Sequence, residues 1–503
     1  MAKRNFLYAV AYACSLLFLA PSCSKDNETA KEDAVGPDLV FYGVTSSNQL
    51  LQYNAKSPGV IDATVAITGL QTGETLLGID FRPATGQLYG VGSTSRIYII
   101  NHLTGRATAI GTTAFSPAIS GSIVSFDFNP TVDRIRLVTS SGQNLRLNPE
   151  TGGVAATDGN INPGTASVSA VAYTNSFAGA TSTTLYDIDI NSKKLYKQDP
   201  PNNGTLVEVG LLNVGAFTDG GFDISPDNDA ALASLTVSGV NTLYMIDLTT
   251  GNATSLGAFA TAVTGIAIPT NSVAYSVDES NNLMMHDFNA SGLPISKPIT
   301  GLQTSEMILG IDMRPATGQL YALGSTSRLY TINMSSGAAT LIGAQFSTLL
   351  SGTSFGFDFN PTVDRIRIVS NTGQNLRLDP NTGAVAAVDG MLNPGTPMVS
   401  AAAYTNNFPG ATTTTLFDID AGTDKLYVQN PPNNGTLVEV GPLGINVDFN
   451  NGFDIGGTSN KAYALLRVGA STKMYSINLT TGAATLFSEF PSNVRGLAIG
   501  LGF

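Results

Sequence analysis

Six aspartates recur at matching positions of short apolar segments, and they are the first candidates for chemistry. Each is the third residue of a segment such as GIDF, SFDF or GFDI; the six are Asp80, Asp127, Asp223, Asp312, Asp358 and Asp454. If these segments surround a common centre, the carboxylates converge there and would bind a hard cation such as Ca²⁺ or raise one another's pKa. The alternative is structural: each aspartate caps a turn or accepts hydrogen bonds from backbone N–H groups of the next unit.

A second recurring set is basic. Arg134 and Arg136 in DRIRLV share one face of an expected strand, and Arg146 in NLRL comes from the strand expected to pair with it around the turn at 140–143. The second half of the chain repeats the set as Arg365, Arg367 and Arg377. Neighbouring guanidinium groups suit carboxylate, sulfate or phosphate, so an acidic polysaccharide would fit. The alternative is a salt bridge between units, to Asp127, Asp133 or their equivalents.

Catalytic motifs are scarce in the sequence. His102 and His286 are the two histidines and do not stand at repeated positions, which argues against a histidine-based triad. The sequence has no P-loop, HExxH or nucleophile-elbow motif. A glycoside hydrolase needs only a pair of carboxylates and no local motif, so this alternative stays open. We assign no catalytic residue, and no cofactor apart from the Ca²⁺ that the aspartates would suit.

The elements that must position these residues come from a duplicated unit. DFNPTVDRIR occurs at 127–136 and at 358–367, GQNLRL at 142–147 and 373–378, and PPNNGTLVEVG at 200–210 and 431–441. The offset is 231 throughout these examples. The chain after residue 38 is therefore two copies of one unit, copy one at 39–270 and copy two at 271–503.

Each copy has a finer period of short strands. The aligned positions 80, 127, 172, 223 and 267 are 47, 45, 51 and 44 residues apart. Short strands separated by Gly, Asn and Asp turns at such a period predict an all-β fold, a β-propeller of about ten four-stranded blades. The chain enters at a second strand and ends on a first strand, so we expect the C-terminal strand to complete the N-terminal blade. One ten-bladed ring and two five-bladed propellers both agree with the sequence.

These motifs resemble a known family. GIDFRPATGQLYGVGS, FDFNPTVDRIRLV, GQNLRLNPETG and PPNNGTL are similar to the domain of unknown function 4394, and the resemblance covers nearly all of 39–503, twice. It implies a secreted, β-propeller-like bacterial domain. It brings no activity, substrate or catalytic residue that could be transferred to this chain.

The N-terminus predicts export. Lys3 and Arg4 precede an apolar run at 6–20, and LAPSC ends at Cys23, which is the layout of a signal peptide. The final cysteine resembles a bacterial lipobox, which implies a signal peptide at 1–22, lipidation of Cys23 and a flexible tether at 23–38. The letters SKDNE at 24–28 resemble the acidic signal that sends some lipoproteins to the outer face of the outer membrane.

Charge and composition narrow the class of partner. The formal net charge is −12, and removing Lys3 and Arg4 gives −12 − 2 = −14. An acidic chain with no basic run does not suit nucleic acid. We expect a cell-surface lipoprotein that touches the membrane only through its lipid and acts as a non-catalytic binding or scaffold module for an extracellular glycan or protein. The alternatives are a propeller glycoside hydrolase or lyase and a purely structural envelope protein.

Overall fold

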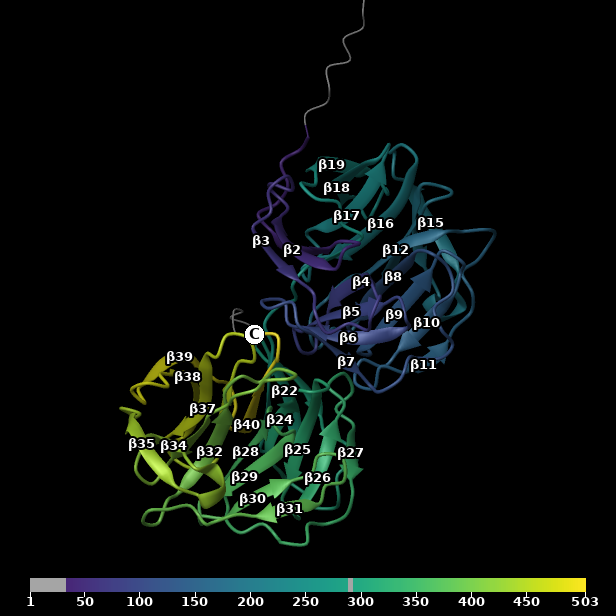
Figure 1. Ribbon diagram of the computed structural model, residues 1–503. Helices are drawn as coiled ribbons and strands as arrows, with labels where there is room; N and C mark the ends of the chain where they lie inside the picture. Colours follow the sequence, from purple (N-terminus) through teal and green to yellow (C-terminus); the bar gives the residue numbers. More distant parts are fainter. Residues whose placement is uncertain (1–32, 288–292) are drawn as a thin grey trace, which may run out of the picture. The chain divides into compact units, whose positions relative to one another are not determined.

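The computed structural model describes residues 33–287 and 293–503 (Figure 1). The predicted signal peptide, Cys23 and most of the predicted tether lie outside these residues. Residues 34–503 form one compact unit. The described part of the chain contains no helix long and apolar enough to cross a bilayer.

The described residues of copy one form five antiparallel four-stranded sheets, with the strand orders β20-β1-β2-β3, β4-β5-β6-β7, β11-β10-β9-β8, β12-β13-β14-β15 and β16-β17-β18-β19. The strands are β1 (Val40–Val44), β2 (Gln49–Asn54), β3 (Ala63–Ala66), β4 (Leu76–Phe81), β5 (Leu88–Gly92), β6 (Arg96–Ile100), β7 (Ala107–Ile110), β8 (Val124–Asn129), β9 (Arg134–Thr139), β10 (Asn144–Leu147), β11 (Val154–Thr157), β12 (Val168–Tyr173), β13 (Leu185–Asp189), β14 (Lys194–Gln198), β15 (Leu206–Leu211), β16 (Phe217–Ile224), β17 (Ala231–Val237), β18 (Val240–Ile246), β19 (Ala253–Ala258) and β20 (Gly265–Ala267).

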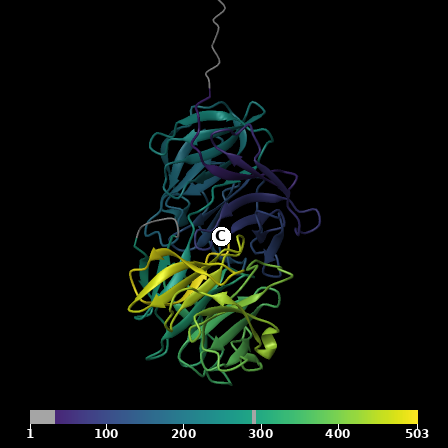
Figure 2. The ribbon, with the colours of Figure 1, turned by 90° about the vertical axis from the view of Figure 1, so that its left-hand side faces the viewer.

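Copy two repeats the pattern with the strand orders β23-β22-β21-β40, β24-β25-β26-β27, β28-β29-β30-β31, β32-β33-β34-β35 and β36-β37-β38-β39 (Figure 2, green and yellow). The strands are β21 (Ala274–Asp278), β22 (Asn282–His286), β23 (Ile295–Pro298), β24 (Ile308–Arg314), β25 (Gln319–Gly324), β26 (Arg328–Ile332), β27 (Ala339–Ile342), β28 (Phe355–Asn360), β29 (Arg365–Ser370), β30 (Asn375–Leu378), β31 (Val385–Val388), β32 (Val399–Tyr404), β33 (Leu416–Asp420), β34 (Lys425–Gln429), β35 (Leu437–Pro442), β36 (Gly452–Ile455), β37 (Ala462–Val468), β38 (Ser471–Ile477), β39 (Ala484–Glu489) and β40 (Val494–Ile499). One 3₁₀ turn stands in each copy, η1 (Pro201–Asn203) and η2 (Pro432–Asn434).

The prediction of an all-β chain with ten four-stranded units is confirmed. In each sheet one edge strand is buried along nearly its whole length, as β12 is, whereas the opposite edge strand, such as β11, alternates partly buried and exposed residues. We call the buried edge strands the inner strands. They contact one another in two closed circuits, β4–β8–β12–β16–β20 returning to β4, and β24–β28–β32–β36–β40 returning to β24.

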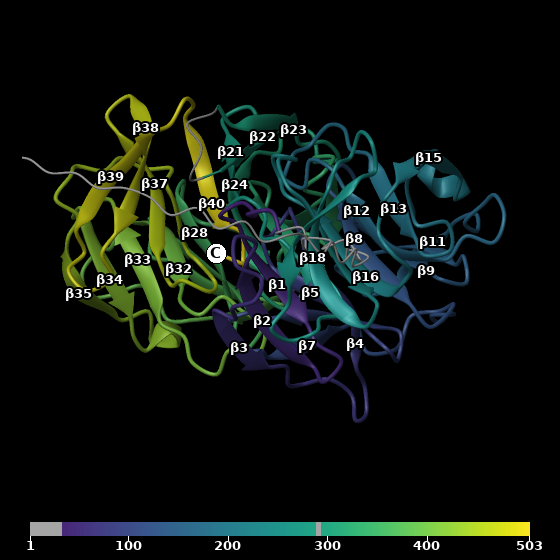
Figure 3. The ribbon, with the colours of Figure 1, turned by 90° about the horizontal axis from the view of Figure 1, so that it is seen from above.

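The predicted role of the C-terminal strand is wrong. β40 pairs with β21 of its own copy, with Ile499 opposite Ala274 (Figure 3), and β20 completes the N-terminal sheet, with Ala267 opposite Tyr42. The segments GIAI at 265–268 and GLAI at 496–499 carry nearly the same pattern, so strand pattern alone does not choose between them. Pairing within a copy closes the shorter loop of chain, which has the lower entropic cost.

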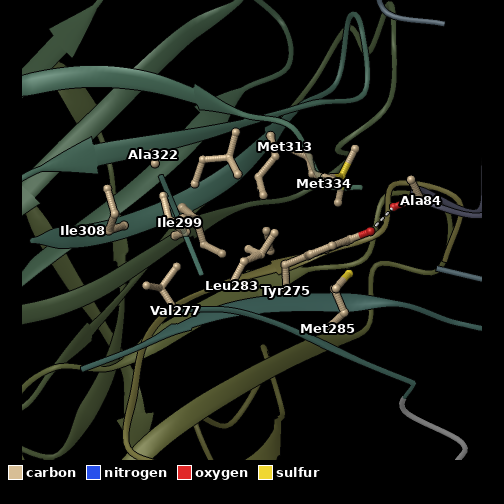
Figure 4. Packing of buried hydrophobic residues seen from close by; sticks show 14 of the residues in the cluster. Ala84, Tyr275, Val277, Leu283, Met285, Ile299, Ile308, Met313, Ala322 and Met334 are labelled. Carbon is tan, nitrogen blue, oxygen red and sulfur yellow. Dashed lines mark hydrogen bonds between the residues drawn. The ribbon is translucent and has the colours of Figure 1, made fainter. Parts of the chain in front are cut away.

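Apolar side chains between neighbouring sheets form the core. One buried cluster lies mainly between the sheets that contain β21 and β24, and it includes Tyr275, Leu283 and Ile308 (Figure 4). The hydroxyl of Tyr275 donates a hydrogen bond to the backbone oxygen of Ala84 (2.9 Å), which satisfies the polar end of this buried side chain. Packing between neighbouring sheets therefore holds the inner strands in place.

Candidate functional site

The circuits of inner strands bring the six sequence-predicted aspartates into two triads. Asp80, Asp127 and Asp223 form one triad, on β4, β8 and β16, and in copy two Asp312, Asp358 and Asp454 form the other, on β24, β28 and β36. Each residue of a triad offers one carboxylate oxygen, and these oxygens lie within 4.8 Å of one another. All six side chains are buried. The third position of the aligned segments GIDF, SFDF and GFDI thus indicated which residues come together.

The triads also tie neighbouring inner strands together. Asp80 accepts hydrogen bonds from the backbone N–H of Phe81 (2.7 Å) and from that of Phe128 on β8 (2.8 Å). Asp127 accepts one from Tyr173 on β12 (3.1 Å). The other donors are Ile224 and Ile268 to Asp223, Met313 and Phe359 to Asp312, Tyr404 to Asp358, and Ile455 and Ile499 to Asp454. The aspartates therefore have the structural role that the sequence offered as the alternative.

Burial makes the triads hold protons. It raises the pKa of all six carboxyl groups, and neighbouring carboxylates raise it further for four of them, Asp80, Asp127, Asp312 and Asp358. The pKa of Asp223 and of Asp454 is raised to about 7. Oδ2 of Asp358 is buried and has no hydrogen-bond partner among the described residues, so this oxygen is the natural position for a shared proton.

The donor set of each triad suits protons better than Ca²⁺. Three carboxylates supply few ligands for an ion that takes six to eight oxygens. In copy two, both oxygens of Asp312, both of Asp454 and one of Asp358 already accept hydrogen bonds, mostly from backbone N–H groups, which is five of the six. A cation at this position would also need further oxygens from the surrounding apolar strands.

Four of the six predicted arginines belong to internal ion-pair networks. Arg136 and Arg146 lie directly opposite each other on β9 and β10 and share the carboxylate of Asp158, at 2.6 and 2.8 Å. Arg136 is buried and also donates to the side-chain oxygens of Asn144 (2.7 Å) and Asn202 (2.9 Å). The equivalent network of copy two contains Arg367, Arg377, Asp389, Asn375 and Asn433. Arg136 and Arg367 thereby hold the Pro-Asn-rich turns through Asn202 and Asn433, whereas Arg146 and Arg377 stay about one-third exposed beside them.

Arg134 and Arg365 lie at the starts of β9 and β29, away from these networks. Each donates to the backbone oxygen of the preceding aspartate, and Arg365 lies 3.3 Å from Asp379. The expected partner, Asp133, instead pairs with Arg82, a fully buried residue that was not among the predicted sites (Nε–Oδ1 2.8 Å). The sequence signal was the FRP or MRP segment that follows the first aspartate in both copies.

A second buried acid occurs once in each copy. Asp187 on β13 and Asp418 on β33 are fully buried, and neither carboxylate oxygen has a hydrogen-bond partner among the described residues. Burial raises the pKa of Asp418 to about 8, although Arg367 opposes the rise. Asp418 is therefore largely protonated at neutral pH and acts as a neutral polar residue in the core, and burial raises the pKa of Asp187 well above its ordinary value too.

Each circuit has a cavity where its inner strands begin. The cavity of copy one measures about 490 Å³, and its polar lining includes Ser46, Asp219 and Thr264. The cavity of copy two measures about 580 Å³ and is lined at the equivalent places by Glu279, Asn450 and Arg495. We call them the copy-one cavity and the copy-two cavity.

Beside each cavity the inner strands approach closely at glycines. A Cβ on Gly221 would lie 2.7 Å from the backbone nitrogen of Ile266, and one on Gly452 would lie 2.4 Å from the carbonyl carbon of Gly496. Only glycine permits such backbone proximity. Neighbouring inner strands therefore lie close together next to each cavity, which leaves little space at the centre of the circuit.

The two copies agree in the residues that hold their inner strands and differ in the residues that line their cavities. The aspartate triads and the Arg–Asp networks are the same in both copies, residue for residue. The cavity linings are not: Asp219 corresponds to Asn450, and Thr264 corresponds to Arg495, both at an offset of 231. The two halves share an architecture and present different chemistry at their cavities.

Fold and site define an all-β repeat protein with two matched halves, and comparison with known proteins gives its family. The family model described as Domain of unknown function (DUF4394) matches residues 49–267 and again 282–498. The chain belongs to this family and contains two tandem copies of its domain, as the resemblance predicted. No curated protein matches the sequence.

Two solved structures are among those similar to the chain. One is the extracellular domain of the putative one component system BT4673 from B. thetaiotaomicron (13% identity, TM-score 0.25, 90% of this chain and 59% of that one). The other is PorZ of Porphyromonas gingivalis, a bacterial surface component of the type-IX secretion system (13% identity, TM-score 0.25, 92% and 61%). The chain thus spans about three fifths of each. A TM-score of 0.25 is too low to establish a common arrangement.

Proposed function

We propose that the protein is a non-catalytic binding module made of two five-bladed β-propellers. Four-stranded sheets whose inner strands contact one another in a closed circuit are the arrangement of propeller blades. Each circuit contains five sheets, which supports two separate propellers over one ring of ten. Each propeller presents one cavity, and an extracellular glycan or protein binds there.

The observation that carries this proposal is that the two copies share one architecture but line their cavities with different residues. The triad aspartates and the Arg–Asp network residues are identical in both halves. The cavity residues at positions 219 and 264 have changed identity and charge in the second copy, to Asn450 and Arg495. Concave sites with a few polar groups are where small ligands bind. A purely structural envelope protein gives no reason for two such cavities.

The cavities do not have the carboxylate pair of a glycoside hydrolase or lyase. Among the residues that line them, Asp219 is the acid of the copy-one cavity and Glu279 that of the copy-two cavity, where it pairs with Arg467 (3.1 Å). The triads do contain paired carboxylates, but these are buried and accept backbone hydrogen bonds. A substrate has no room between them, so binding without turnover is the better-supported function.

For the cellular location we propose export and a lipid anchor on the cell surface. The support is the sequence of the first 28 residues, with the apolar run, Cys23 and the acidic letters that follow it. The lipid would be the contact with the outer membrane, and the propellers would face outward. An acidic surface makes nucleic acid an unsuitable partner. For the triads we propose shared protons and no resident metal ion.

The test uses soluble protein that begins at residue 24. It is incubated with a panel of neutral and acidic polysaccharides, with Ca²⁺ and with chelator, and binding and product release are recorded in the same samples. We expect binding of at least one polysaccharide without release of oligosaccharide. Released oligosaccharide would contradict the proposal and favour the hydrolase or lyase. If no polysaccharide binds, the proposal requires a protein ligand, captured by the wild type and lost when the cavities are filled.

A further inference from the structure

The copy-two cavity contains a buried arginine whose hydrogen-bond partners among the described residues are backbone carbonyl groups. Arg495 lies at the start of β40 and is 6% exposed. Its Nη1 donates to the backbone oxygen of Ile308 (3.1 Å) and its Nη2 to that of Glu279 (3.3 Å). Within the described residues no carboxylate lies within 4.0 Å of this guanidinium group. The carbonyls fix its orientation but do not neutralise its charge.

The nearby acids are already engaged. The Glu279 side chain pairs with Arg467 (3.1 Å). Asp278 accepts hydrogen bonds from the backbone N–H of Ser280 (2.9 Å) and of Asn282 (2.7 Å). Both acids favour the charged form of Arg495 from a distance, yet burial outweighs them and lowers its pKa. A buried charge without a close counter-ion is costly, and a bound anion would offset that cost.

The fold does not require an arginine at this position. The equivalent residue of copy one is Thr264, whose hydroxyl donates to the backbone oxygen of Val44 (3.2 Å). The same inner-strand geometry is thus built with a small neutral side chain. Arg495 is therefore a property of the copy-two cavity and not of the architecture.

We propose that the copy-two cavity binds the carboxylate group of an acidic saccharide, with Arg495 as the anchor of that carboxylate. This inference rests on the proposed binding function and adds the chemical class of one ligand. The guanidinium fork matches a carboxylate in a bidentate manner. The copy-one cavity, which has Thr264 and Asp219 at the equivalent places, does not bind this group.

The remaining lining suits a sugar. The hydroxyls of Ser325 and Thr353 and the side-chain amide of Asn450 line the cavity, and this amide has no hydrogen-bond partner among the described residues. Leu309 and Leu350 offer apolar surface for the C–H face of a sugar ring. A cavity of about 580 Å³ takes one or two rings, whereas an extended acidic peptide would need a longer groove.

The experiment measures binding by isothermal titration calorimetry on soluble protein beginning at residue 24. The probes are oligosaccharides of galacturonate, glucuronate and mannuronate, their neutral methyl esters, and a penta-glutamate peptide. The variants are Arg495→Thr, which introduces the residue of copy one, and Arg96→Thr, a matched arginine replacement outside both cavities. We expect a uronate oligosaccharide to bind the wild type and Arg96→Thr equally. Arg495→Thr and methyl esterification should each weaken binding at least about tenfold, as expected for loss of a charge-assisted pair.

Three results would overturn the inference. They are failure of every uronate to bind the wild type, unchanged binding to Arg495→Thr, and Arg495-dependent binding of the peptide alone. If no uronate binds but a neutral glycan binds a cavity independently of Arg495, the inference fails and the proposed function stands. Should Arg495→Thr unfold, Arg495→Lys keeps the charge without the fork and is expected to weaken binding by a smaller factor than esterification does.

Discussion

The aspartate triads predict that replacing Asp223 changes how stability depends on pH. The pKa of this carboxyl is raised by burial to about 7 in the folded protein, from an ordinary value of 3.8. Between these two values the folded state holds a proton that the unfolded state has released. The contribution of Asp223 to the unfolding free energy is therefore fully present below about pH 4, falls as the pH rises to about 7, and is constant above that value.

The magnitude follows from the two pKa values. They differ by roughly 3 pH units, and each unit corresponds to about 1.4 kcal/mol, so the free energy of unfolding changes by roughly 4 kcal/mol across this range. Asp223→Asn removes the titration. It keeps one acceptor oxygen for the N–H groups of Ile224 and Ile268 and loses the other, at a pH-independent cost of about 1 kcal/mol.

The assay is urea unfolding at several pH values between about 4.5 and about 8.5. The quantity of interest is the difference in unfolding free energy between wild type and Asp223→Asn, because subtraction removes the contributions of titrating groups that do not interact with Asp223. One of these is His286, whose pKa is lowered by burial to about 4 and whose contribution is lost as the pH falls. Asp62→Asn, at an exposed position, is the control. A difference between wild type and Asp223→Asn that stays constant with pH would refute the reasoning.

Three further predictions concern the other buried groups. Arg136→Met should lower the unfolding free energy by about 2 to 3 kcal/mol in urea titrations, because the buried Asn144 loses the guanidinium that it accepts from, while Asp158 keeps Arg146; Lys194→Ala, at an exposed pair, should leave the midpoint nearly unchanged, and equal losses would contradict the network. Asp418→Asn should have little effect on the melting temperature at about pH 4 and raise it at about pH 8, since the pKa of the native acid is about 8 against an ordinary value of 3.8 and the unfolded state releases its proton between these values; a variant that is less stable at both pH values would disprove this. Millimolar Ca²⁺ at about pH 8 should move the melting temperature by less than about 1 °C, and a larger rise that disappears in Asp127→Asn would establish a cation site.

The inner strands and their aspartates could be predicted from the sequence, because the repeat period and the residue types can be read from short segments. Aligning short strands by their third residue placed Asp80 and Asp223 at one centre although 143 residues separate them, 223 − 80. It did not find Asp158 as the partner of Arg136, since that pairing depends on a turn after β11 that folds back on β9. Closure of the sheets was mispredicted for a related reason: β20 and β40 look alike as segments.

The cavities were beyond the reach of pattern reading, because they form only when five strands close into a circuit. One signal was present nevertheless. A position-by-position comparison of the two copies shows Thr264 against Arg495 and Asp219 against Asn450, each one or two residues before a glycine and an apolar run that recur in both copies. Differences between copies, more than the identities that first attract the eye, indicate where the two halves do different things.

Filling the cavities tests the central claim most directly. Ser46→Trp and Ser325→Trp place a large side chain at exposed lining positions of the copy-one and copy-two cavities, and Thr249→Trp adds the same side chain to an outer turn. Binding of the ligand found in the polysaccharide or protein screen is measured for each variant and for the double variant. The account predicts that binding is lost on filling the occupied cavity and kept in Thr249→Trp. Full binding by the double variant would contradict it.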